Sequence, residues 1–257
     1  MFSRNEYIND PVLQTQEKQV QELFENDKPI VIFDIGACEG ESSIRYSRIF
    51  QVSSIYTFEP IPANFQRIEE NIKHFQTTQI HPFQLCLSDT NGEADFYVSS
   101  AEVKNTQAKD WDYGNKSSSL LAPEKTLDLY NWLEFKEKVT VKTQTLEHFC
   151  QVRQIFSIDF VHLDVQGAEL LVLAGAGNLP IQSMWLEVER VALYKNQPLK
   201  KETEHFMQAK GFIKIIDTVN HISGDQFWVQ KNLLINKKGA DFYKKIQYQM
   251  AVRDLKN

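Results

Sequence analysis

Cysteine is scarce in this sequence of 257 residues, and the three that occur are scattered as Cys38, Cys86 and Cys150. No two of them form a C-x-x-C pair, so the sequence predicts neither a disulfide framework nor a structural zinc site. A chain without disulfides is typical of a reducing compartment, and we therefore expect a cytoplasmic protein.

Long apolar runs and an excess of positive charge are also lacking. No apolar run approaches the ~20 residues that a membrane-spanning helix needs, and the N-terminal residues 1–7 lack the apolar core of a signal peptide. The formal net charge is −6, which disfavours binding to phosphate backbones over a wide surface. We therefore expect no membrane span and no nucleic-acid partner. The sequence does not indicate an oligomeric state.

The hydrophobic fraction of 42% is ample for the core of one α/β domain. Short β-branched runs alternate with segments of helical periodicity. Strands are expected at 29–34, 54–59, 80–88, 157–164, 182–188, 212–216 and 227–235, and helices at 41–50, 63–75, 167–174 and 198–210. This alternation predicts a Rossmann-like, doubly wound, seven-stranded and mostly parallel sheet with an antiparallel edge strand.

Three parts of the chain are expected from this pattern. Residues 1–28 form an N-terminal helical extension with an amphipathic helix at 12–25, residues 29–236 form the main domain, and residues 237–257 form a Lys-rich helical tail. Asn91-Gly92 predicts a hairpin whose second arm is 93–99. A short strand is expected at 139–143, and Thr145 is expected to cap a short helix.

The irregular polar stretch at 100–138 interrupts the main domain. A long loop of this kind is usually functional or partly disordered. Trp111, Tyr113 and Trp132 could stack on a sugar or an apolar substrate, which would make the insertion a lid. An insertion that makes no contact with substrate is the alternative.

The first candidate binding motif is the turn Asp34-Ile-Gly36-Ala37-Cys-Glu-Gly40 after the first expected strand. Its glycines allow a sharp turn and a close approach to a ligand. Glu59 ends the next strand, where an acid can accept both hydroxyls of a ribose. These features are shared by sites for dinucleotides and for S-adenosylmethionine. Alternatively, Asp34 and Glu59 only cap the ends of strands.

The charge around this turn distinguishes the two cofactors. A pyrophosphate needs a helix N-terminus without nearby acids, usually with a third glycine. Glu39 and Glu41 flank the turn, which lacks the G-x-G-x-x-G pattern. S-adenosylmethionine carries a sulfonium and an ammonium, so an acidic turn favours it over NAD. Ser88-Asp89, after the third expected strand, could contact its adenine, or could simply form a turn.

A second group of acids follows the fourth and fifth expected strands. Alternation places His162 and Asp164 on the same side of one strand, and Glu187 and Glu189 on the same side of the next. Three interpretations are open: oxygen ligands for Mg²⁺ from Asp164, Glu187 and Glu189, a general base with hydrogen-bond acceptors, or ordinary surface charge. Asp164 is our first candidate base and His162 the second. Glu169 suits the first turn of a helix.

Together these residues resemble the FkbM family of methyltransferases, from about Val31 to Phe212. The resemblance lies on short motifs in a fixed order: FDIGACEG at 33–40, TFEP at 57–60, LSD at 87–89, SSSL at 117–120, TL at 145–146, IDFVHLDVQGAE at 158–169, EV at 187–188, LY at 193–194 and GF at 211–212. The family often has Asn, Lys and Glu at the positions of Cys38, His162 and Gln166.

The resemblance implies a class I methyltransferase fold and O-methylation of hydroxyls on sugars, polyketides or related metabolites. It also implies that Gly36 and Gly40 belong to the cofactor turn, Glu59 to the ribose site and Asp164 to the boundary between cofactor and substrate. We therefore expect an S-adenosylmethionine-dependent methyltransferase with a small-molecule or glycan acceptor. An NAD-linked oxidoreductase and a non-catalytic α/β binding module are the alternatives.

Overall fold

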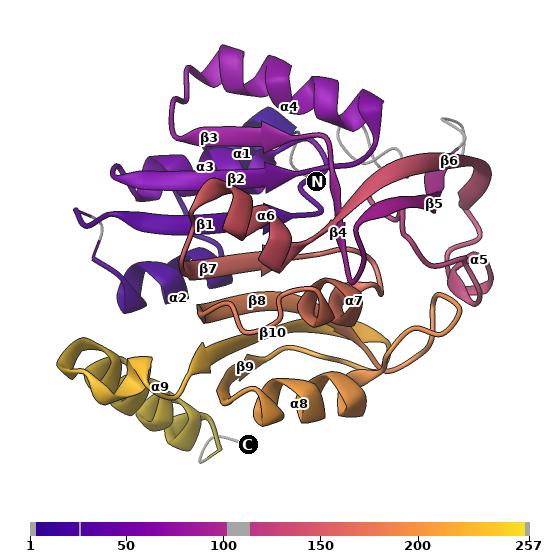
Figure 1. Ribbon diagram of the computed structural model, residues 1–257. Helices are drawn as coiled ribbons and strands as arrows, with labels where there is room; N and C mark the ends of the chain where they lie inside the picture. Colours follow the sequence, from indigo (N-terminus) through magenta and orange to yellow (C-terminus); the bar gives the residue numbers. More distant parts are fainter. Residues whose placement is uncertain (1–3, 26, 102–113, 255–257) are drawn as a thin grey trace.

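The computed structural model describes residues 4–25, 27–101 and 114–254. Its main sheet has seven strands in the order β3-β2-β1-β7-β8-β10-β9 (Figure 1). The strands are β1 (Ile30–Ile35), β2 (Ser53–Phe58), β3 (Ile80–Phe83), β7 (Ile158–Leu163), β8 (Ile181–Glu189), β9 (Phe212–Asp217) and β10 (Ser223–Gln230).

Neighbouring strands from β3 to β8 run parallel, and β10 runs antiparallel to both β8 and β9. The predicted fold class, a mostly parallel seven-stranded α/β sheet with antiparallel pairing at its edge, is confirmed. The expected strand at 227–235 was shifted, because β10 begins at Ser223 and the chain leaves the sheet after Gln230 into a 3-10 turn, η1 (Leu233–Ile235).

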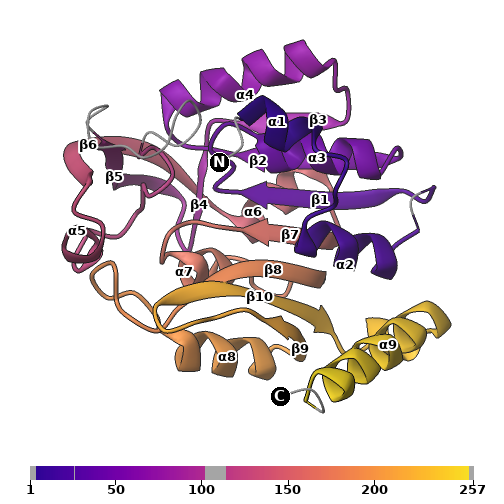
Figure 2. The ribbon, with the colours of Figure 1, turned by 180° about the vertical axis from the view of Figure 1, so that it is seen from behind.

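Helices cover both faces of this sheet (Figures 1 and 2). The helices of one face, which supply Phe149, Val172 and Met207 to its core, are α6 (Leu146–Arg153), α7 (Glu169–Ala174) and α8 (Lys200–Ala209). The other core includes residues of α1 (Arg4–Asn9), α2 (Thr15–Leu23), α3 (Glu41–Ile49), α4 (Pro62–Phe75) and α9 (Lys237–Asp254). Two apolar layers therefore enclose the parallel strands, as the apolar runs predict.

The N-terminal helices are tied to this second layer by a buried arginine. Arg45 of α3 forms an ion pair with Glu17 of α2 at 2.5 Å, and the two side chains are 4% and 1% exposed. The same guanidinium donates hydrogen bonds to the carbonyl oxygens of Tyr7, Asp10 and Val12. These contacts hold α1 and α2 against α3. The division into extension, main domain and tail stays a prediction.

A second, smaller sheet corrects two of the expectations. The stretch 80–88 is not one strand, because a tight turn in which Leu85 N–H donates to Phe83 O separates β3 from β4 (Cys86–Ser88). The predicted hairpin was also wrong: β4 and β5 (Gly92–Ala101) do not pair, because β6 (Leu133–Thr145) lies between them in the order β4-β6-β5. A short helix, α5 (Thr126–Leu129), precedes β6.

Strand β6 is much longer than the strand expected at 139–143, and it takes in the end of the stretch 100–138 that was expected to be irregular. Leu133, Phe135, Val139 and Val141 occupy alternate positions along it, and between them only Glu137 breaks the alternation. This period of two was the signal for a strand with one face on the protein. The tail helix α9 begins at Lys237, where the helical tail was expected to start.

Candidate functional site

The turn after β1 is built around two glycines with positive φ. Gly36 has φ +83°, and a Cβ there would lie 1.7 Å from the carbonyl oxygen of Asp164, so no other residue fits between β1 and the turn after β7. Gly40 has φ +79° and caps α3, and a Cβ there would lie 3.3 Å from Ile68 of α4. Gly36 thus brings two strand ends together, and Gly40 lets α3 pack against α4.

Glu59 follows β2 and is 4% exposed. Its two carboxylate oxygens accept hydrogen bonds from the backbone N–H groups of Cys38, at 3.0 Å, and Ile61, at 2.8 Å. Burial raises the pKa of this carboxyl to about 8. The Asn64 side chain also hydrogen-bonds to this carboxyl, and a carboxylate can accept about four hydrogen bonds, so capacity remains for a ligand.

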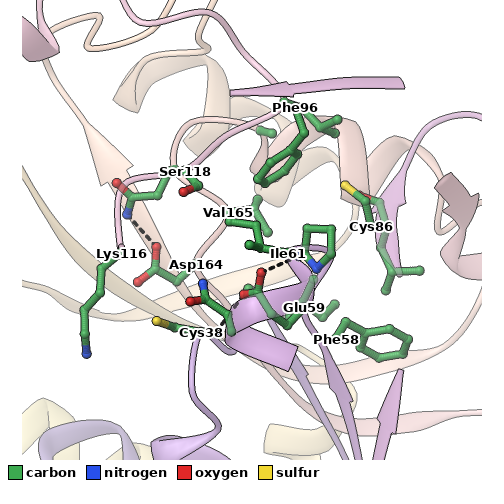
Figure 3. A pocket seen from close by; sticks show the side chains of 18 of the residues that line it. Cys38, Phe58, Glu59, Ile61, Cys86, Phe96, Lys116, Ser118, Asp164 and Val165 are labelled. Carbon is green, nitrogen blue, oxygen red and sulfur yellow. Dashed lines mark hydrogen bonds between the residues drawn. The ribbon is translucent and has the colours of Figure 1, made fainter. Parts of the chain in front are cut away.

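An open pocket lies beside Glu59 at the carboxyl ends of β1, β2 and β7, the edge of a parallel sheet where ligands bind. In Figure 3 the apolar residues Phe58, Cys86 and Phe96 lie on one side of Glu59, and Cys38, Lys116 and Asp164 lie on the other. The pocket therefore has an apolar end, a central acid and a polar end.

Several predicted cofactor residues do not line this pocket. Asp34 is buried and accepts a hydrogen bond from the Ser43 hydroxyl at 2.5 Å, and burial raises its pKa. Ala37 is buried in the turn between Gly36 and Cys38. Ser88 and Asp89 close β4, where the Ser88 carbonyl oxygen lies only 2.1 Å from the Cβ position of Gly175. The residues just before them, Leu85, Cys86 and Leu87, line the pocket.

Asp164 lies where the sequence predicted, at the carboxyl end of β7, and it is exposed at the polar end of the pocket. Gln166 Nε2 donates hydrogen bonds to Oδ1 of Asp164 and to Oε2 of Glu187, each at 2.7 Å. Gln166 has φ +55°, a left-handed conformation that is uncommon for a residue other than glycine. Tyr194 O–H also lies 3.3 Å from Gln166 Oε1.

The glutamates around Asp164 hold their protons strongly. Burial and the nearby Asp164 carboxylate raise the pKa of Glu187 well above its usual range, and burial with Glu169 raises that of Glu189 to about 9. Burial raises the pKa of Glu169 to about 7, although its Oε1 accepts the N–H groups of Val165 and Gly167. Glu169 therefore shapes the turn after β7 as well as suiting the first turn of α7.

A metal ion is not supported by this arrangement. Across the ranges 4–25, 27–101 and 114–254, no group of three or more His, Cys, Asp or Glu side chains is placed to hold one. The set Asp164, Glu187 and Glu189, which the sequence suggested for Mg²⁺, is interrupted by Gln166, because its amide nitrogen already fills the space between the first two carboxylates.

His162 pairs with Asp34 across β1 and β7 rather than facing the pocket. Its Nδ1 lies 3.2 Å from the Tyr46 hydroxyl and 3.7 Å from Oδ1 of Asp34, and its side chain is 15% exposed. The parity argument placed His162 and Asp164 on one side of β7, but His162 lies deeper, against α3.

The insertion contributes to the pocket through residues that the sequence analysis did not select. Trp111 and Tyr113 lie outside the described residues, and Trp132 is half-buried in the turn before β6, away from the pocket. Instead Asn115, Lys116, Ser118 and Leu120 line it. The SSSL motif at 117–120 was the available signal, but its polar side chains have no periodicity that indicates a binding role.

Comparison with known proteins identifies the family. A sequence model of the methyltransferase FkbM domain matches residues 34–214, from β1 to β9. The chain belongs to the FkbM methyltransferase family. It is therefore an S-adenosylmethionine-dependent methyltransferase, and this finding does not favour the NAD-linked or non-catalytic alternatives.

Two curated proteins resemble this FkbM methyltransferase. The 2-O-methyltransferase NoeI of Sinorhizobium fredii is 30% identical over 182 residues, which are 71% of this chain and 70% of NoeI. Methyltransferase 1 of Beauveria bassiana is 25% identical over 147 residues, 56% of this chain and 57% of that protein. Among solved structures, TrmK of M. capricolum with S-adenosylhomocysteine has a TM-score of 0.45 and 14% identity, covering 86% of this chain and 69% of TrmK.

The FkbM domain includes every wall of the pocket. The donor set also fits the cofactor of the family: an apolar slot for a flat base, an acid for two ribose hydroxyls, and a polar end for an amino acid. Within the described part of the methyltransferase, no helix is both long and apolar enough to cross a membrane.

Proposed function

We propose that the chain methylates a hydroxyl group on a small-molecule or glycan acceptor. The observation that carries the proposal is the exposed carboxylate of Asp164, held by Gln166 at the polar end of the cofactor pocket. The relative NoeI, named as a 2-O-methyltransferase, supports an oxygen acceptor. The net charge of −6 favours such an acceptor over a nucleic acid.

The cofactor would lie with its adenine in the apolar slot near Phe96 and Cys86, and with both ribose hydroxyls donating to Glu59. When bound, S-adenosylmethionine supplies an electrophilic methyl group on a sulfonium, which an acceptor oxygen attacks in line. Because the leaving group is already good, the protein contributes mainly by alignment in a site that excludes water.

A neutral alcohol must lose its proton as it attacks. Asp164 is the proposed base, since it is exposed at the pocket and held in one orientation by Gln166. A positioned base contributes on the order of 10²- to 10⁴-fold to a rate. His162 is the second candidate, but its ring lies against Tyr46 and Asp34. We propose that no divalent metal takes part, because Gln166 separates the carboxylates that would hold one.

Calorimetry with S-adenosylhomocysteine tests the cofactor site. The wild-type protein should bind it with micromolar affinity and should not bind NAD, whereas E59A should lose the binding. Retained affinity in E59A would overturn the ribose assignment. Glu93→Ala is the matched control, since Glu93 is exposed and does not line the pocket.

The base assignment requires an acceptor, which a screen of sugars and phenols for methyl transfer from labelled cofactor would provide. D164N should then lower kcat by about 10²-fold or more while the protein still binds S-adenosylhomocysteine. H162Q should have a smaller effect, and the reverse order would make His162 the base. Turnover that falls with EDTA and returns with Mg²⁺ would contradict the metal-free mechanism.

A further inference from the structure

A short segment of the insertion, residues 114–120, crosses the polar end of the pocket; we call it the strap. It is fixed from both sides. Ser117 N–H donates to the Ser99 hydroxyl of β5 at 3.0 Å, and the Ser119 hydroxyl donates to the carbonyl oxygen of Gln166 at 2.7 Å. Tyr194 O–H donates to Ser117 O at 2.7 Å. The strap is therefore a built wall of the site.

Asn115 is the most deeply buried polar residue that the strap gives to the pocket, with 7% of its surface exposed. Its Nδ2 donates to the Cys38 sulfur at 3.2 Å, next to the cofactor turn. Its Oδ1 is buried and has no hydrogen-bond donor among the described residues. Because a buried acceptor without a donor is unfavourable, this atom points to a ligand that donates a hydrogen bond, as an ammonium group does.

Lys116 brings a cation to the same end of the pocket. Its Nζ lies 3.2 Å from Oε1 of Glu41, and the two side chains are 31% and 5% exposed. An ammonium group has three donors, so Lys116 can keep Glu41 and also bind an anionic group of a ligand. The strap thus presents an acceptor and a cation from two consecutive residues, a combination that matches the ammonium and carboxylate of an amino acid.

The order of groups along the cofactor places its amino-acid end here. Adenine, ribose, sulfur and amino acid follow one another, so the base and the amino acid lie on opposite sides of the ribose. Glu59 lies between the apolar end, with Phe96 and Cys86, and the polar end, with Lys116 and Asp164 (Figure 3). If the ribose binds Glu59 and the base fills the apolar slot, the amino acid meets the strap.

We propose that the strap is the recognition element for the amino-acid end of the cofactor. Asn115 Oδ1 accepts a hydrogen bond from the α-ammonium group, and Lys116 Nζ pairs with the α-carboxylate. The inference rests on the proposed placement of the ribose on Glu59. It makes Asn115 and Lys116, which come from an insertion rather than from the parallel-sheet core, determinants of cofactor specificity.

Three ligands that share the adenosine group separate the two roles. S-adenosylhomocysteine has both charged groups, its decarboxylated analogue has only the amine, and 5′-methylthioadenosine has neither. Affinities are measured by calorimetry on the full chain. K116M should weaken S-adenosylhomocysteine by about 10- to 100-fold and leave the other two ligands unchanged. N115A should weaken both amine-bearing ligands by about tenfold, again without affecting methylthioadenosine.

K116R, which keeps the charge, should restore much of the preference for the carboxylate, and Lys142→Met at an exposed position of β6 is the matched control. The strap has no recognition role if K116M and N115A change none of the three affinities. The same conclusion follows if both variants weaken all three ligands equally while their thermal unfolding midpoint stays that of the wild type. A wrong placement of the ribose on Glu59 would give a different result. E59A would then leave the affinity for methylthioadenosine unchanged in the wild type and in the K116M and N115A variants.

Discussion

Gln166 and Asp164 are joined by a hydrogen bond of 2.7 Å from an amide nitrogen to a carboxylate oxygen, and the same nitrogen also reaches Glu187. The backbone of Gln166 is left-handed, and its carbonyl oxygen accepts the Ser119 hydroxyl. Strained residues at a pocket persist only where the surroundings hold them. The contact to the strap is one such restraint, and it directs the amide between the two acids.

Replacing Gln166 tests this arrangement. Q166A removes the donor that orients Asp164, so kcat should fall by about tenfold while affinity for S-adenosylhomocysteine changes little. Q166E places a third carboxyl beside two others, which raises the already raised pKa of Glu187 further. When the added carboxyl is ionised it repels Asp164 instead of donating to it, so the loss of kcat in Q166E should grow as the pH rises. The measurement is kcat as a function of pH for both variants. Y194F is measured in the same way, because it removes the hydroxyl that hydrogen-bonds to Gln166 Oε1.

Cofactor affinity should depend on pH through Glu59. Its pKa is raised to about 8 by burial, so in the free protein the carboxyl is mostly protonated at pH 6, whereas two ribose hydroxyls bind best to the ionised form. Affinity for S-adenosylhomocysteine should therefore increase by up to about tenfold per pH unit below pH 8 and level off above it. E59Q should give weak binding with a flat profile over pH 6–9. An equally steep profile in E59Q would assign the dependence to another group.

The same shift has a consequence for stability. A carboxyl whose pKa is higher in the folded than in the unfolded protein favours folding fully below the unfolded value. Its contribution declines as the pH rises from about 4.5 towards about 8. Without ligand, the wild type should lose stability relative to E59Q over this interval, as urea denaturation at several pH values would show. A constant difference would mean that the carboxyl is not shifted.

Gly36 and Gly211 form a natural pair for mutation, because their φ values are +83° and +84°. A Cβ at Gly36 would meet the Asp164 carbonyl at 1.7 Å, but at Gly211 it would meet only the Gln230 side chain at 3.3 Å. G211A should therefore show the backbone cost alone, about 1–2 kcal/mol. G36A should lose more stability and also S-adenosylhomocysteine binding. Denaturation and calorimetry check both, and equal losses would contradict the close approach of β1 and β7.

The buried pair of Arg45 and Glu17 should matter far more than exposed pairs. Removing one partner leaves an uncompensated buried charge, so E17A should lower the free energy of unfolding by about 3–5 kcal/mol. The exposed pair of Lys245 and Glu22 is the control, and E22A should have little effect. Urea denaturation of both variants is the measurement. A small loss in E17A would show that the N-terminal helices do not depend on this contact.

The central strands could be predicted from the sequence because their side chains are buried on both faces. β1 is apolar at every position but Asp34, and β7 and β8 carry apolar residues at both odd and even positions, as a strand buried on both sides requires. Glu59 and Asp164 could be predicted for a related reason: the acids directly follow such runs. The site residues found from sequence are those whose position is fixed by the sheet.

The strap could not be found in this way. Asn115 and Lys116 lie in a polar stretch without periodicity, and their position depends on single contacts from Ser99, Gln166 and Tyr194, which are distant in the sequence. The predicted hairpin was wrong for a similar reason. Asn91-Gly92 indicates a local turn, but it carries no information that the distant strand β6 lies between β4 and β5. Ser88-Asp89 lies outside the pocket lining because the chain leaves the main sheet at Phe83.

The strand order has a consequence for synthesis on the ribosome. β1 pairs with β2 on one side and with β7 on the other, and the first residue of β7 is Ile158. Until that segment emerges, β1 is the exposed edge of a three-stranded sheet, a surface that invites pairing with other chains. The nascent chain must remain in this open state while the 74 residues that follow β3, 84–157, are translated. Protection by a chaperone would matter most in that interval, before any cofactor can bind.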